Sequence, residues 1–200
     1  MLAMVLAVAV SGLHFDCAGP ITPAMPASAI LSRFGKDARR GEVTGADGRP
    51  VKGVVLYGDD PARRLEIAFW DEAQTAVESV TAGATATAWT GPLGLHAGSS
   101  LDEVRILNGH NFGIGGFGWL YGGYITNAWG GKLTPAGGCA VQVRFAIAGK
   151  IPKAIHGELD LNSKMPEVKA ADPHVDRLSV SWPLPAGIRM SDDGKERLGF

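Results

Sequence analysis

Apolar side chains at every second position mark several segments of the chain as strands with one face on a hydrophobic core. The alternation is clearest at residues 65–70, 139–147 and 178–182. A β-branched run at residues 51–57 and a shorter one at residues 77–81 predict two further strands. The pattern therefore predicts a chain that is rich in sheet.

Two short helices are predicted where apolar residues recur at intervals of three and four. The first begins at Ser28, the expected N-cap, and stops at Gly35. The second begins at Ser100, which forms a capping box with Glu103, and it ends at Gly109. Each helix is followed by strand-like sequence.

A β-hairpin is predicted between residues 117 and 129. The strand-like runs 117–121 and 124–129 flank a Gly-Gly pair at 122–123. A two-residue hairpin loop needs positive φ, which glycine adopts at no steric cost. The sequence therefore predicts a tight turn at this pair.

The register of that hairpin would sort its side chains by face. Trp119, Tyr121 and Tyr124 would share one face, and Leu120 and Ile125 would share the other. If the aliphatic residues face the core, the rings are exposed and could anchor a partner or stack on a sugar. If the rings form the core side, no binding site is left there.

The order helix, glycine stop and strand pair occurs twice, which predicts an α+β fold. We expect an antiparallel sheet with two short helices, in one version as two tandem helix-plus-hairpin units. The alternative is a β-sandwich with helical turns. Residues 1–26 are expected to form a leader and a Pro/Ala-rich linker, 27–190 a single domain, and 191–200 a flexible tail.

The amino-terminal residues 1–10 form an uninterrupted apolar run. About 20 residues are needed to cross a bilayer as a helix, so this run predicts a secretory signal and no transmembrane span. A buried first element is the alternative. Small residues suit cleavage after Ala9 or after Ala29. The protein is expected in the periplasm or outside the cell.

Cys17 and Cys139 are the only two cysteines. An oxidising compartment would allow a disulfide between them, closing a loop of more than 100 residues. Cleavage after Ala29 would instead leave Cys139 alone. Both outcomes remain open from the sequence.

Composition and motifs exclude several classes of function. A formal net charge of −1 gives no general attraction to nucleic acid, so no nucleic-acid partner is predicted. Residues 113–118 match G-x-G-x-x-G, but a helix precedes them and a strand follows, the reverse of a dinucleotide site. The sequence holds no H-E-x-x-H, C-x-x-C, G-x-S-x-G or S-x-x-K motif. We therefore predict no catalytic residue, metal or cofactor.

Two segments resemble known exported bacterial proteins. Residues 94–109 are similar to the helix-plus-sheet unit of the β-lactamase-inhibitor-protein family and of the outer-membrane-assembly lipoproteins. That resemblance implies binding of other proteins rather than catalysis. Residues 108–133 resemble a family of exported bacterial proteins with a Gly-Phe-Gly-Trp-x-Tyr-Gly-Gly core, which implies no particular function.

The predicted binding surface is the aromatic hairpin with the polar residues that flank it. Its candidate residues are Trp119, Tyr121, Tyr124, Trp129, Asn108, His110, Asn111 and Asn127. The first hypothesis is a non-catalytic exported protein that binds another envelope or secreted protein through this surface. The alternatives are a carbohydrate or cell-wall-glycan binding module, and a hydrolase with a dispersed site.

Overall fold

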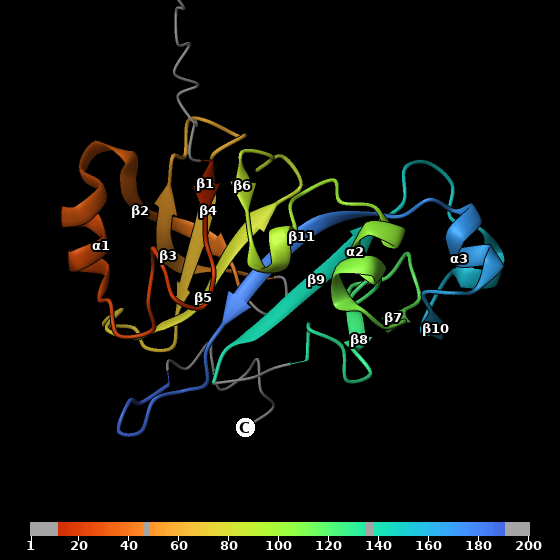
Figure 1. Ribbon diagram of the computed structural model, residues 1–200. Helices are drawn as coiled ribbons and strands as arrows, with labels where there is room; N and C mark the ends of the chain where they lie inside the picture. The colour runs from red at the N-terminus through yellow and green to blue at the C-terminus, as the bar shows by residue number, and fades with distance from the viewer. Residues whose placement is uncertain (1–11, 46–48, 135–137, 191–200) are drawn as a thin grey trace, which may run out of the picture.

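The computed structural model describes residues 12–45, 49–134 and 138–190, and these form an α+β fold with antiparallel sheets (Figure 1). The predicted signal at residues 1–10 and the predicted tail at 191–200 lie outside the described residues. None of the helices in the described ranges is long and apolar enough to cross a bilayer.

A six-stranded antiparallel sheet is the main element of the fold. Its strands, in spatial order, are β2 (Ala38–Thr44), β3 (Pro50–Leu56), β4 (Leu65–Phe69), β5 (Val77–Gly83), β11 (His174–Ser181) and β9 (Ala140–Ala146). Five of these were predicted from the sequence. The edge strand β2 was not, because most of its side chains are exposed and polar and it shows no apolar alternation.

A smaller three-stranded sheet lies at the other end of the molecule. Its order is β10 (Asp160–Asn162), β7 (Gly113–Gly115) and β8 (Ile125–Asn127). The helices are α1 (Ala27–Phe34), α2 (Leu101–Asn108) and α3 (Pro166–Ala170). In Figure 1, α1 lies beside β2 and β3, α2 and α3 accompany the small sheet, and β9 and β11 run between the two ends.

A helix followed by an antiparallel strand pair occurs twice, but the two pairs have different surroundings. The pair β2–β3 after α1 belongs to the six-stranded sheet, whereas β7–β8 after α2 belongs to the small sheet. One continuous hydrophobic cluster extends through both ends. It includes the stacked rings of Phe112 and Phe145, whose centroids are 5.9 Å apart.

The register of the main sheet gives its two faces different chemistry. Val54, Ile67, Val80 and Val180 occupy paired positions and are fully buried in the core. The adjacent row contains Glu66, Thr81, Ser179 and Gln142, and it lies on the opposite side of the sheet. We call this side the polar face.

Residues 12–26 belong to the folded unit, so the predicted linker ending at residue 26 is wrong. Strand β1 (Leu13–His14) pairs with β6 (Trp89–Thr90) in parallel. Phe15 and Ile21 are buried in the main core, and the ring of Phe15 packs edge-on against Trp89. The linker was predicted from the proline and alanine content, in which Phe15 and Ile21 stand as isolated apolar residues without a periodic pattern.

The open question about the cysteines is answered by a disulfide between Cys17 and Cys139. Their Cα atoms are 5.9 Å apart, and Cys139 directly precedes β9. The bond therefore attaches the amino-terminal segment to one edge of the main sheet.

The two predicted helices form with one change in capping. Ser100 and Glu103 make the capping box of α2, and Gly109 ends that helix with a left-handed backbone. At α1 the N-cap is Pro26, and no side chain caps the helix. The prediction of Ser28 as N-cap is therefore wrong, because α1 already begins at Ala27.

Candidate functional site

The aromatic segment folds as a long loop between β7 and β8, which corrects the predicted two-residue hairpin. We call residues 116–124 the aromatic loop. Within it the amide of Gly122 donates to the carbonyl of Trp119, and the amide of Gly123 donates to the carbonyl of Gly115. The expected pairing of Tyr121 with Tyr124 does not form. The turn begins already at Trp119, and the amide of Gly123 is bonded to β7 at Gly115 instead of lying in a two-residue hairpin loop.

Hydrogen bonds on two sides hold the aromatic loop in place. The amide of Phe145 on β9 donates to the carbonyl of Gly123 at 2.9 Å. On the other side, the amide of Phe117 donates to the carbonyl of Ile155, and the amide of Gly157 donates to the carbonyl of Phe117. The side chain of Phe117 is buried. The loop is therefore anchored to both sheets and presents its remaining side chains on a fixed support.

Two rings of the aromatic loop pack edge to face. The centroids of Trp119 and Tyr121 are 5.5 Å apart, with 78° between the ring planes. The indole nitrogen of Trp119 donates to the carbonyl of Gly116 at 2.9 Å. This bond satisfies the polar atom of the indole and fixes the orientation of its ring.

The ring of Tyr124 lies between the aromatic loop and the main sheet. The guanidinium of Arg144 lies 5.8 Å from the centroid of this ring and also 3.2 Å from a carboxylate oxygen of Asp176. Burial raises the pKa of Asp176, although Arg144 and Arg177 oppose that effect. Tyr124 thus has a cationic neighbour on its sheet side.

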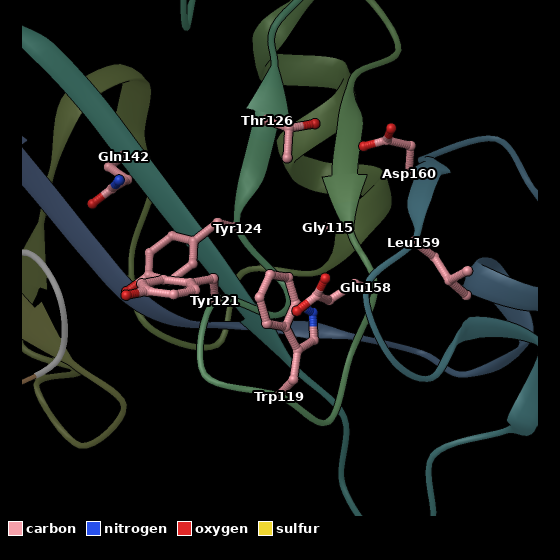
Figure 2. Close-up of a pocket in the computed structure, with 9 residues that line it drawn as sticks. All are labelled: Gly115, Trp119, Tyr121, Tyr124, Thr126, Gln142, Glu158, Leu159 and Asp160. Atoms are coloured by element: carbon pink, nitrogen blue, oxygen red, sulfur yellow. The ribbon is translucent and has the colours of Figure 1, made fainter. Parts of the chain in front are cut away.

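The three rings line an open groove of about 500 Å³, which we call the aromatic groove (Figure 2). Figure 2 shows Glu158 beside the ring of Trp119 and the rings of Tyr121 and Tyr124 grouped next to each other. Gln142 is on β9, Thr126 is on β8 and Asp160 is on β10. The lining residues are Gly115, Trp119, Tyr121, Tyr124, Thr126, Gln142, Glu158, Leu159 and Asp160. Flat apolar surfaces and groups that form hydrogen bonds therefore meet in one concave site.

The exposure of the loop differs from the prediction. Leu120 was expected on the face opposite the rings, but its side chain is 63% exposed, while Ile125 is partly buried against the core. Tyr121 is 49% exposed, and Trp119 and Tyr124 are half-buried. The rings remain accessible to a ligand, although the reason differs from the predicted one.

The predicted polar flank does not reach the groove. Asn108 is 1% exposed, and its amide group donates to the carbonyls of His110 and Ala128 and accepts from the amide of Leu133. The side chain of Asn127 accepts from the amide of Trp129. These two asparagines therefore have structural roles.

Three other predicted residues also lie outside the lining of the aromatic groove. They are His110, Asn111 and Trp129, whose side chain is 44% exposed. Of the eight predicted residues, the structure brings only Trp119, Tyr121 and Tyr124 together around one site.

The groove contains polar side chains that sequence reasoning missed. Thr126 and Asp160 are on different strands of the small sheet, and Gln142 is on β9. Glu158 lies two residues before β10. No local pattern marks these residues, because they meet only when β8, β9 and β10 come together. The alternation of polar and apolar residues at 158–161 is a weak sign of a strand there, but it does not mark Glu158 or Asp160 as part of a site.

The groove is rich in hydrogen-bond acceptors. Its described lining residues include two carboxylates, one amide and three hydroxyls, two of them on tyrosines, but no lysine, arginine or histidine. No group of three potential metal ligands occurs among the described residues. Comparison of the chain with protein-family models, with curated proteins and with solved structures finds no match.

Proposed function

We propose that this protein is an exported, non-catalytic binding protein that takes a carbohydrate chain in the aromatic groove. The observation that carries the proposal is the meeting of three accessible aromatic rings with Gln142, Glu158 and other polar side chains in one open groove. Its volume of about 500 Å³ falls in the range of small-ligand sites.

The two halves of the lining match the two halves of a sugar. Pyranose rings have apolar C–H faces, which gain contact area on tryptophan and tyrosine at low entropy cost. Their hydroxyl groups need acceptors and donors at the ring edge. Carboxylates such as Glu158 accept strong hydrogen bonds, and the amide of Gln142 both donates and accepts.

Export is the part of the proposal that the disulfide supports. Disulfides persist in oxidising compartments and are rare in the cytosol, and Cys17 is bonded to Cys139. A signal cleaved after Ala29 would remove Cys17 together with the buried Phe15 and Ile21. We therefore expect cleavage near Ala9, which leaves the core intact.

A matched pair of tryptophan variants tests the carbohydrate site. Trp119 lines the groove, whereas Trp129 is exposed outside it. We expect cello-, chito- or malto-oligosaccharides to bind the wild type in calorimetric titrations, Trp119→Ala to weaken that binding at least tenfold, and Trp129→Ala to leave it unchanged. Failure of all three of these series and of an oligogalacturonate, or equal losses in both variants, would overturn the proposal.

A protein partner is the second candidate function, favoured by the aliphatic side chains at the rim. Leu120 is 63% exposed and Leu159 is 40% exposed, which a sugar ligand does not require. Leu120→Ser should weaken binding of a protein partner and leave sugar binding unchanged. Release of new reducing ends from a bound oligosaccharide would instead favour the hydrolase, with Glu158 or Asp160 as the acid or base.

A further inference from the structure

The aromatic groove continues onto the polar face of the main sheet. A second hollow of about 190 Å³ shares Tyr124 and Gln142 with it. The other residues that line this second hollow are Thr44, Gly45, Trp70, Glu78, Ser79, Thr81, Arg177, Ser179, Ser181 and Trp182. A third hollow, of about 150 Å³, shares Thr44, Thr81 and Arg177 with the second. The three hollows therefore follow one another across a single face of the protein.

The sheet register gives the scale of this series. Gln142 on β9 pairs with Ser179 on β11, Ser179 pairs with Thr81 on β5, and Thr81 pairs with Glu66 on β4. Three strand spacings separate Gln142 from Glu66, which corresponds to roughly 14 Å. Arg177 lies two residues from Ser179 on the same strand, so its backbone is about 7–8 Å from that of Gln142.

Arg177 differs from the other arginines near this face because it has no hydrogen-bond or ion-pair partner among the described residues. Arg64 binds Glu66 at 2.8 Å, and Arg144 pairs with Asp176 at 3.2 Å. The partly buried side chain of Arg177 lines both the second and the third hollow. A guanidinium in this position offers a planar fork of donors that suits a carboxylate.

The surroundings of Arg177 are polar, and their acidic groups have interactions of their own. Burial would raise the pKa of Glu66, but hydrogen bonds from the Thr44 amide and from Arg64 keep it below its ordinary value. Glu78 is buried, lines the second hollow and has an interaction of its own. The hydroxyls of Thr81 and Ser179 bond to each other at 2.9 Å. The charge of Arg177 acts on the neighbouring Asp176, where it opposes the rise in pKa that burial causes, but among the described residues its guanidinium forms no hydrogen bond or salt bridge. Its donors therefore remain available to a ligand.

We infer that the polar face holds an anion subsite centred on Arg177, and that the ligand is an acidic oligosaccharide such as one built from uronic acids. This inference rests on the proposed function, because one chain would place a sugar ring in the aromatic groove and a carboxylate beside Arg177. Each of the two smaller hollows has room for about five or six water molecules. That space suits a carboxylate-bearing sugar unit.

A pair of ligands with and without charged carboxyl groups tests the subsite. Oligogalacturonate and its fully methyl-esterified form share one backbone, and the ester replaces each carboxylate with a neutral methyl ester, so the dependence of their affinity ratio on Arg177 reports the carboxylates. We expect the wild type to bind the acid about tenfold more tightly than the ester at 50 mM salt, and this preference to shrink at 500 mM salt. Arg177→Gln should abolish the preference and leave ester binding unchanged, while Arg177→Lys should retain part of it.

Arg40→Gln is the matched charge control, because Arg40 is an exposed residue of β2 outside all three hollows. It should keep the full preference for the acid. If the ester binds and Trp119→Ala abolishes that binding, but the acid binds no more tightly or Arg177→Gln changes nothing, the anion subsite is overturned and the carbohydrate site stands. If the acid depends on Arg177 but not on Trp119, the subsite stands and the aromatic groove is overturned. If neither the acid nor the ester binds, the anion subsite is overturned.

Discussion

The amide of Phe145 donates to the carbonyl of Gly123, and this 2.9 Å bond joins the aromatic loop to the edge strand of the main sheet. Gly123 has a φ of +80°, and a Cβ atom there would overlap the carbonyl oxygen of Phe145. The position thus requires glycine for two reasons, its backbone conformation and the close approach of β9. The contact holds the end of the loop that carries the three groove rings.

Gly123→Ala should therefore displace the aromatic loop and cost about 2–4 kcal/mol of unfolding free energy. Ligand binding in the aromatic groove should be lost as well. Gly130→Ala is the matched control, because Gly130 has a similar φ of +74° but open space around its Cα. We expect that variant to cost only about 1–2 kcal/mol for backbone strain. Equal losses in urea unfolding would show that the contact with Phe145 has no role.

The disulfide between Cys17 and Cys139 should contribute strongly to stability, because 122 positions separate the two residues. The chain-entropy model gives an upper value of about 5 kcal/mol for a loop of this size. Reduction with dithiothreitol should lower the urea midpoint of the wild type by a corresponding amount. The Cys17→Ser/Cys139→Ser double variant should have the lowered midpoint with or without reductant. A wild-type midpoint that does not respond to full reduction would contradict the prediction.

The two predicted helix caps should differ in their effect on stability. Ser100 accepts a hydrogen bond from the amide of Glu103, so Ser100→Ala should cost about 1 kcal/mol. Ser28 is exposed within α1 and caps nothing, so Ser28→Ala should be neutral within about 0.5 kcal/mol. Thermal unfolding of the two variants side by side measures the difference, and an equal loss would argue against the capping box.

Glu66 should make the folded state sensitive to acid. Its burial opposes ionisation, but the Thr44 amide and Arg64 hold the pKa of its carboxyl below the ordinary value of 4.5. A lowered pKa in the folded state means that the stabilising contribution is present above pH 4.5 and is lost as the pH falls through the lower folded value. Glu66→Gln should therefore lower stability by about 1 kcal/mol at pH 7 and by progressively less below pH 4.

Glu42→Gln is the control for that pH series, because Glu42 is an exposed residue of β2 with no partner among the described residues. Its unfolding free energy should follow that of the wild type across the pH range. A Glu66→Gln variant that loses the same stability at pH 3 as at pH 7 would show that protonation of Glu66 plays no part.

Local patterns along the chain were sufficient for the elements whose side chains face one core. The alternation around Leu65 and around Leu178 predicted β4 and β11, because a period of two reports directly which face of a strand is buried. The capping box at Ser100 located α2 for a similar reason, since every partner lies within four residues. Trp119, Tyr121 and Tyr124 were likewise found because tyrosine and tryptophan are conspicuous in a glycine-rich segment.

The sequence by itself therefore determined the class of the fold, most of the main sheet and the aromatic part of the candidate site. Only the tertiary structure decided that residues 12–26 belong to the folded unit, that Cys17 is bonded to Cys139, and that the Gly-Gly pair lies in a long loop. It also placed Gln142, Glu158 and Arg177 along one face. The physical reason is that periodicity records what one segment does, whereas these features depend on contacts between segments far apart in the chain.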